Sequence, residues 1–118
     1  MKVIIAGSRD FYDYNFLVNK IRESGMKITT VVSGGAKGVD SLGESYSRES
    51  GITLKVFPAD WGTLGKSAGF IRNKQMADYA DALICIRVNH SKGSTHMIKT
   101  MVEKGKKVFL VDITTEWL

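Results

Sequence analysis

Short apolar runs rich in β-branched residues recur along the chain, separated by polar turns and by segments with helical spacing. Their length and composition predict buried β-strands. The runs cover residues 2–6, 28–32, 53–57, 82–86 and 107–111. Apolar residues at helical spacing predict amphipathic helices between them, at residues 13–25, 38–49, 67–79 and 94–104. Strands that alternate with helices indicate an α/β fold with a parallel sheet covered on both faces.

Right-handed crossover connections leave few topologies for such a sheet. We expect a Rossmann-like five-stranded sheet with strand order 3-2-1-4-5, in which the first and fourth strands are neighbours at the switch point. No repeat or linker interrupts residues 1–118, so a single domain is expected. Ligands bind such sheets at the carboxyl ends of the strands. Every unusual loop of the chain falls at that edge: residues 7–10, 33–38, 58–65 and 89–95.

The second predicted strand runs into a glycine-rich turn that opens a helix. Ser33, Gly34, Gly35 and Gly38 lie within this turn, and Lys37 adds a positive charge. Glycines let backbone N–H groups approach an anion, and a helix N-terminus adds partial positive charge. The spacing matches neither the Gly-x-Gly-x-x-Gly motif nor a P-loop. The turn therefore predicts either a phosphate site or a tight strand-to-helix connection without a ligand.

Composition narrows the class of protein. Of the 118 residues, 43% are hydrophobic and 25% are charged, as in ordinary globular domains. No apolar run approaches the roughly 20 residues of a membrane span, and the apolar part of the N-terminus is too short for a signal peptide. The lone Cys85 excludes an internal disulfide and, within an apolar run, is interpreted as a buried structural thiol. A cytoplasmic protein is expected.

Charge points to anionic partners. The formal net charge of +5 favours nucleotides, nucleic acid or acidic proteins. The basic residues are scattered and form no long run, which argues against a nucleic-acid binder. His90 and His96 are not spaced as metal ligands with a cysteine or paired carboxylates, so both are expected at the surface. No metal and no cofactor are expected.

Four segments occur in order along the chain. Gly7-Ser8-Arg9 follows the first predicted strand, Ser33–Asp40 follows the second, Arg72–Met76 lies in the third helix, and Gly93-Ser94-Thr95 opens the fourth. Together they resemble the SLOG superfamily, the Rossmann-like group that includes the lonely-guy phosphoribohydrolases and the DNA-processing protein A family. The resemblance covers nearly the whole chain and is closest to the small stand-alone branch related to YpsA, found in bacteria and their phages. It implies a pocket for a nucleotide or a nucleotide-derived ligand.

The resemblance and the loop positions give one set of candidate ligand- and phosphate-binding residues. These are Gly7, Ser8, Arg9, Ser33, Gly34, Gly35, Lys37, Gly38, Asp40, Arg72, Asn73, Gly93, Ser94 and Thr95. Arg72 matches the helix arginine that the phosphoribohydrolases use in their active site. Gly93 and Ser94 match the Gly-Thr of their Pro-Gly-Gly-x-Gly-Thr-x-x-Glu motif, whose two earlier glycines are absent here. Met97 holds the position of the catalytic glutamate, and a thioether cannot act as a base.

Several candidates have a structural alternative. Arg9 can fork onto a phosphate or pair with Asp10 or Asp40. Asp40 can hydrogen-bond a ribose hydroxyl or brace Arg9 and Ser8, and we favour bracing. Trp61, on the long loop, can stack on a base or make an ordinary lid contact.

These residues predict a protein that senses, carries or sequesters a nucleotide or a nucleotide-derived ligand without turning it over. An N-glycosidic hydrolase of nucleotide metabolism is the alternative, and a single-stranded nucleic-acid binder is a further one. Ser94 and Thr95 are expected as N-cap residues of the fourth helix, with ligand contact as an added role. A homodimer or higher oligomer is expected, with Met97, Met101 and Tyr79 as adaptable apolar surface.

Overall fold

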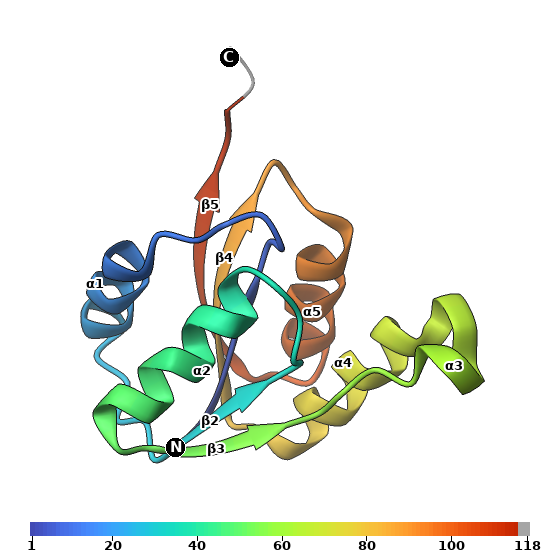
Figure 1. Ribbon diagram of the computed structural model, residues 1–118, viewed down its shortest axis with the longest axis horizontal. Helices are drawn as coiled ribbons and strands as arrows, with labels where there is room; N and C mark the ends of the chain where they lie inside the picture. Colours follow the sequence, from blue (N-terminus) through green and yellow to red (C-terminus); the bar gives the residue numbers. More distant parts are fainter. Residues whose placement is uncertain (116–118) are drawn as a thin grey trace.

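The computed structural model of the protein describes residues 1–115. One sheet contains five parallel strands in the order β3-β2-β1-β4-β5, as Figure 1 shows. The strands are β1 (Lys2–Gly7), β2 (Thr30–Ser33), β3 (Thr53–Val56), β4 (Ala82–Val88) and β5 (Lys107–Ile113). The predicted α/β class and the strand order 3-2-1-4-5 are confirmed.

Helices cover both faces of the sheet (Figure 1). They are α1 (Tyr14–Ser24), α2 (Val39–Ser50), α3 (Trp61–Leu64), the 3-10 turn η1 (Gly65–Ser67), α4 (Ala68–Tyr79) and α5 (Lys92–Glu103). Leu17 of α1 and Val39 of α2 join the core on one face, whereas Met76 of α4 and Met97 of α5 join the core on the other. Within residues 1–115, no helix has the length and apolar character needed to cross a membrane.

Strands β1 and β4 form the centre of the sheet and are buried along most of their length. Val3, Ile4 and Ile5 of β1 have no exposed surface. Successive side chains point to opposite faces, so Val3 and Ile5 pack with α1 and α2 while Ile4 packs with α4 and α5. Burial on both faces explains why these strands form continuous apolar runs instead of an alternating pattern.

Strand β2 begins at Thr30 and not at residue 28 as predicted. The residues before it wrap around the start of the chain. The amino group of Met1 donates to the carbonyl oxygen of Lys27 at 2.9 Å, and the N–H of Thr29 donates to the carbonyl oxygen of Met1 at 2.9 Å. These backbone groups are therefore satisfied outside the sheet, and the ladder starts only at Thr30.

Helix α5 begins at Lys92, earlier than predicted, because Ser91 is its N-cap residue. Ser94 and Thr95 lie inside its first turns, so the prediction that they cap the helix is wrong. The long 58–65 loop is not wholly irregular, because the carboxylate of Asp60 accepts a backbone N–H and caps the short helix α3.

The methionines of α5 lie in the core. Met97 is 1% exposed and Met101 is 0% exposed, because both lie on the helix stripe that faces the sheet. Tyr79 is half-buried and packs on Phe57, with ring centroids 5.4 Å apart. The prediction that Met97 and Met101 offer an exposed surface for self-association is wrong, and association itself stays a prediction.

Glycines bring three segments into backbone contact at the carboxyl edge of the sheet. A Cβ added to Gly7 would lie 2.1 Å from the carbonyl oxygen of Ile86 in β4. Gly38 has φ 75° and ψ −127°, and an added Cβ would lie 2.3 Å from the carbonyl oxygen of Ser8. Only glycine fits both positions. The loops after β1 and β2 therefore interlock with each other and with β4.

Candidate functional site

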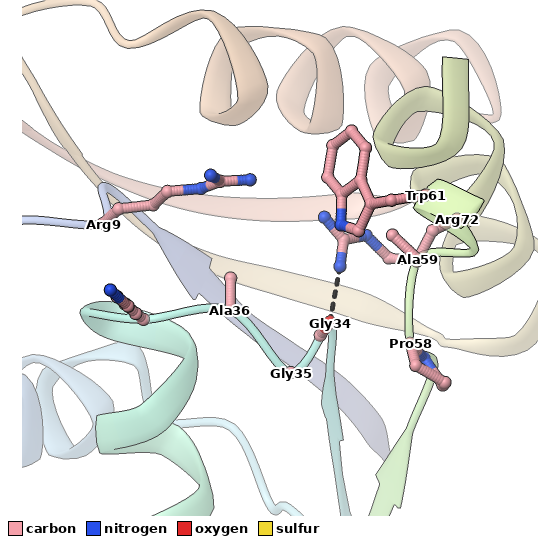
Figure 2. A pocket seen from close by; sticks show the side chains of 9 residues that line it. Arg9, Gly34, Gly35, Ala36, Pro58, Ala59, Trp61 and Arg72 are labelled. Carbon is pink, nitrogen blue, oxygen red and sulfur yellow. Dashed lines mark hydrogen bonds between the residues drawn. The ribbon is translucent and has the colours of Figure 1, made fainter. Parts of the chain in front are cut away.

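Two neighbouring hollows open at the carboxyl ends of the strands. The first, here the Trp61 hollow, has a volume of about 500 Å³ and is drawn in Figure 2. The second, here the serine hollow, has a volume of about 490 Å³ and lies at the switch point between β1 and β4. Both volumes suit a small molecule. Arg9, Ala36 and Arg72 line both hollows, so the two form one divided cleft.

The remaining lining differs between the hollows. The Trp61 hollow is further lined by residues of the glycine turn and of the segment after β3, namely Gly34, Gly35, Lys37, Pro58, Ala59 and Trp61. The serine hollow is further lined by Ala6, Gly7, Ser8, Asp10, Asp40, Asn73, Met76, Val88, Asn89, Ser91, Gly93, Ser94 and Met97. The structure thus brings together most of the predicted site residues, but Ser33, Gly38 and Thr95 line neither hollow.

Arg72, on α4, is held at the boundary between the hollows. Its Nη1 donates to the carbonyl oxygen of Gly34, and its Nε donates to Oδ1 of Asn73 at 3.2 Å. Figure 2 shows the first bond as a dashed line from α4 to the end of β2. Burial lowers the pKa of the Arg72 guanidinium, and the nearby Asp40 carboxylate opposes this effect. An arginine remains charged under such a perturbation, so a fixed positive charge lies in the cleft.

Asn73 connects this arginine to helix α5. It is 5% exposed, and its Nδ2 donates to the carbonyl oxygen of Gly93 at 3.4 Å. The same Nδ2 lies 3.1 Å from Nδ1 of His96. The bond from Arg72 identifies the other amide atom as the oxygen, and because an amide nitrogen only donates, Nδ1 of His96 must accept. Burial lowers the pKa of His96, which favours the neutral ring that can accept. His96 is therefore not the free surface histidine that was predicted.

Arg9 lies on the exposed loop after β1 and reaches across the mouth of the Trp61 hollow, as Figure 2 shows. Its guanidinium carbon is 5.9 Å from the centroid of the Trp61 ring, at the outer limit of a cation–π contact. Within residues 1–115, Arg9 forms no ion pair, so the alternative partners Asp10 and Asp40 are not used. Its charge also lowers the pKa of Arg72, which means that two like charges face each other across the cleft.

Asp40 braces the glycine turn. The sequence analysis had favoured bracing of Arg9 and Ser8 instead. Its Oδ2 accepts the N–H of Ala36 at 3.3 Å, and the residue is 4% exposed. Burial raises the pKa of Asp40 to about 6, although the Ala36 amide and the charge of Arg72 lower it. The carboxylate thus occupies part of the space where an anion was expected to meet the turn.

Two backbone amides of the glycine turn, those of Gly35 and Ala36, find acceptors within the protein, as does that of Val39 at the start of α2. The N–H of Gly35 donates to Oγ of Ser33 at 3.1 Å, and the N–H of Val39 donates to the carbonyl oxygen of Ser8 at 3.3 Å. Ser33 is fully buried and donates in turn to Glu44 at 2.7 Å. These bonds hold the turn in place, and the turn presents Lys37 and the neighbouring backbone to the Trp61 hollow.

Three serines form a hydroxyl chain along one wall of the serine hollow. Ser91 donates to Oγ of Ser94 at 2.8 Å, and Oγ of Ser8 lies 2.9 Å from that of Ser91. Oγ of Ser8 also accepts the N–H of Val88 at 2.8 Å. Because Ser91 makes no side-chain cap hydrogen bond, the first-turn amides of α5 remain as donors for a ligand. Thr95 instead donates to the carbonyl oxygen of Ser91 at 2.9 Å.

Few carboxylates are placed for chemistry. Asp10 and Asp40 line the serine hollow, whereas Asp60 caps α3 and Asp112 pairs with Arg87 at 2.7 Å. Among residues 1–115, no three His, Cys, Asp or Glu side chains gather where they could hold a metal ion.

Sequence reasoning missed several lining residues. These are Ala6, Ala36, Pro58, Ala59, Met76, Val88, Asn89 and Ser91, together with Asp10 and Met97, which the sequence analysis discussed but did not include among the binding residues. Two carried a usable signal: Asn89 has φ 49°, a left-handed conformation in which asparagine is enriched, and Ser91 is a serine at a helix start. The apolar lining residues carried no such signal, because apolar residues are equally common in the hydrophobic core.

Comparisons with known proteins identify the family and agree with the fold. The family described as "YspA, cpYpsA-related SLOG family" matches residues 1–63. Gene 61 protein of Mycobacterium phage D29 is 30% identical over 114 residues, which cover 88% of this chain and 90% of that protein. The X-ray structure of DNA processing protein A (DprA) from Streptococcus pneumoniae is similar with a TM-score of 0.76 at 19% identity. That likeness covers 92% of this chain but 49% of DprA, about half its length, and it concerns the fold.

Proposed function

The chain belongs to the YspA, cpYpsA-related SLOG family, and from this premise we propose that it binds a nucleotide or a nucleotide-derived ligand across its divided cleft. The observation that supports the proposal is that two arginines, Arg9 and Arg72, each line both hollows. A guanidinium binds a phosphate through two parallel hydrogen bonds. Arg9 has no ion-pair partner within residues 1–115, so its charge is available for such a contact.

The serine hollow suits the nucleoside part of the ligand. The exposed carboxylate of Asp10 offers acceptors, and the first-turn amides of α5 offer donors, to a sugar and a base. The side-chain amides of Asn73 and Asn89 pair within the protein and shape the wall. Met97 adds an apolar, polarizable surface. A site with an apolar wall and a few converging polar groups is the usual arrangement for a small organic ligand.

Retention of the ligand unchanged is the favoured outcome. Met97 is buried where the phosphoribohydrolases have a catalytic glutamate, and it cannot stabilise a developing ribosyl cation. One observation favours the hydrolase as a second candidate: Asp40 lines the serine hollow, and burial raises its pKa to about 6, which suits a general acid or base near neutral pH.

A thermal-shift panel of nucleosides, nucleotides and short single-stranded oligonucleotides tests the proposal. A ligand at 100 times its dissociation constant adds roughly 2.7 kcal/mol to the free energy of unfolding. Chromatography of the incubated ligand then separates the two candidates. Intact ligand supports binding, whereas free base that is released over many turnovers and lost in Asp40→Ala supports the hydrolase.

Arg9→Ala tests the site itself by titration calorimetry with any nucleotide found in the panel. Loss of a charge-assisted hydrogen bond should weaken binding by roughly 1.5–3 kcal/mol, about 10- to 150-fold. The fold should be little affected, because Arg9 is exposed. Arg48→Ala is the matched control, since Arg48 is an exposed arginine in the last turn of α2. Equal affinity in both variants would place the site elsewhere.

A further inference from the structure

The polar side chains of the Trp61 hollow are all hydrogen-bond donors. Arg9, Lys37 and Arg72 are cations, and the indole N–H of Trp61 is a donor without an acceptor atom. The remaining lining residues are glycine, alanine and proline, so no carboxylate, amide or hydroxyl side chain lines this hollow. The serine hollow differs, because carboxylates, amides and hydroxyls all line it.

The positive charge in the Trp61 hollow is incompletely balanced. Within residues 1–115, no carboxylate lies at ion-pair distance from Arg9 or Lys37. The charge of Arg9 disfavours the charged form of Arg72, as expected for two guanidiniums that face each other. An anion placed between them would convert this repulsion into attraction.

The apolar part of the wall strengthens such an interaction. Pro58, Ala59 and the Trp61 ring stand opposite the glycine turn, as Figure 2 shows. A charge pair beside apolar groups is screened less than a pair in open water. The hollow therefore combines donors and positive charge beside apolar groups, which is the chemistry of a phosphate subsite.

We propose that the Trp61 hollow holds a second phosphate, and that the ligand is a nucleotide with two or more linked phosphates. The inference rests on the proposed function, which places the nucleoside in the serine hollow. The first phosphate then lies at the boundary between Arg9 and Arg72, which both hollows share. The second phosphate extends past the boundary to Lys37, which lines only the Trp61 hollow.

Titration calorimetry with matched mono- and diphosphates of adenosine, guanosine, cytidine and uridine tests the inference. The buffer contains a chelator, so that no divalent metal masks the phosphate charge. The wild type should bind the diphosphate about tenfold or more tightly than the monophosphate of the same base. Lys37→Gln should remove most of this preference while the monophosphate affinity changes by less than about twofold. Lys37→Arg should retain the preference, because it keeps the charge.

Lys66→Gln is the control, since Lys66 is an exposed lysine in η1 that lines neither hollow. It should leave both affinities unchanged. Equal binding of mono- and diphosphates by the wild type overturns the inference but leaves the proposed function intact. A Lys37→Gln variant that weakens both ligands equally also overturns it, because Lys37 would then contact the first phosphate. A loss of free nucleoside binding in Trp61→Leu would place the base in this hollow instead. If no nucleotide binds at all, the proposed function fails as well.

Discussion

Asp40→Asn should change how the stability of the protein depends on pH. Burial raises the pKa of Asp40 from its ordinary value of 3.8 to about 6 in the folded protein. Between these values the folded state holds a proton that the unfolded state has lost. Stability therefore falls as pH rises through this window, and it is constant with respect to this group outside the window.

The size of the effect follows from the two pKa values. At about 1.4 kcal/mol for each pH unit, the interval from 3.8 to about 6 corresponds to about 3 kcal/mol. An asparagine side chain cannot titrate, so the variant lacks this loss. The free energy of unfolding of the variant, minus that of the wild type, should rise by about 2.4 kcal/mol of this total between pH 4 and pH 7, because the unfolded state is still partly protonated at pH 4. Any constant effect of the new amide, such as a poorer contact with Arg72, cancels in this comparison.

Urea denaturation followed by tryptophan fluorescence at half-unit pH steps measures this difference. Other titrating groups, including His96 and Asp112, are shared by both proteins and cancel to first order. Asp10→Asn is the control, because Asp10 is an exposed carboxylate of the same hollow and its variant should follow the wild type. A flat difference would refute the argument that burial dominates at Asp40. A difference that falls with pH would mean that attraction to Arg72 outweighs burial.

Further substitutions test the scaffold. Gly38→Ala should cost more than about 3 kcal/mol or prevent folding, because its Cβ would lie 2.3 Å from a carbonyl oxygen. Gly51→Ala, at a position with φ 66° and open space around it, should lower the free energy of unfolding by about 1 kcal/mol. If urea titrations gave equal losses of stability for the two variants, the argument that Gly38 is crowded would be contradicted. Met101→Ala should cost about 2–5 kcal/mol, and Val102→Ala, at 61% exposure, under about 0.5 kcal/mol. Asn73→Ala should lower stability by about 1–3 kcal/mol, and an unchanged denaturation midpoint would argue against its buried hydrogen bonds.

The sheet could be predicted because its signals are local. Val3 to Ile5 and the equivalent run in β4 are apolar on both faces. A short run of that kind between helical segments is typical of a buried strand in a parallel sheet. The strand order followed from the handedness of crossover connections, which the sequence need not encode residue by residue. The start of β2 was missed because it depends on the bond between Met1 and Lys27, which are distant in the chain.

The clustering of most candidate residues at one edge of the sheet could be predicted, but the contacts between them could not. Three hydroxyl residues near the start of α5 are of types preferred at the N-cap. Ser91 differs from the other two in its non-helical backbone (φ −51°, ψ 139°) and in its contact with Ser8, 83 residues away. The link between Arg72 and the carbonyl oxygen of Gly34 spans 38 residues. A sequence pattern shows which residue types are present, but it does not show which residues contact one another in the fold.

Loops that interlock through their backbones cannot open one at a time. The N–H groups of Ser8, Val39 and Val88 each donate across a boundary between the loops after β1, β2 and β4. Their amide hydrogens should therefore exchange with solvent in a single cooperative opening, at the slow end of the exchange rates of the protein. Residues 61–67, of which Trp61 lines the Trp61 hollow, are all exposed and project from the body at α3, as Figure 1 shows. They should therefore exchange independently and faster. A ligand that binds as proposed would thus meet one side of the cleft that is already fixed and one side that can still adjust.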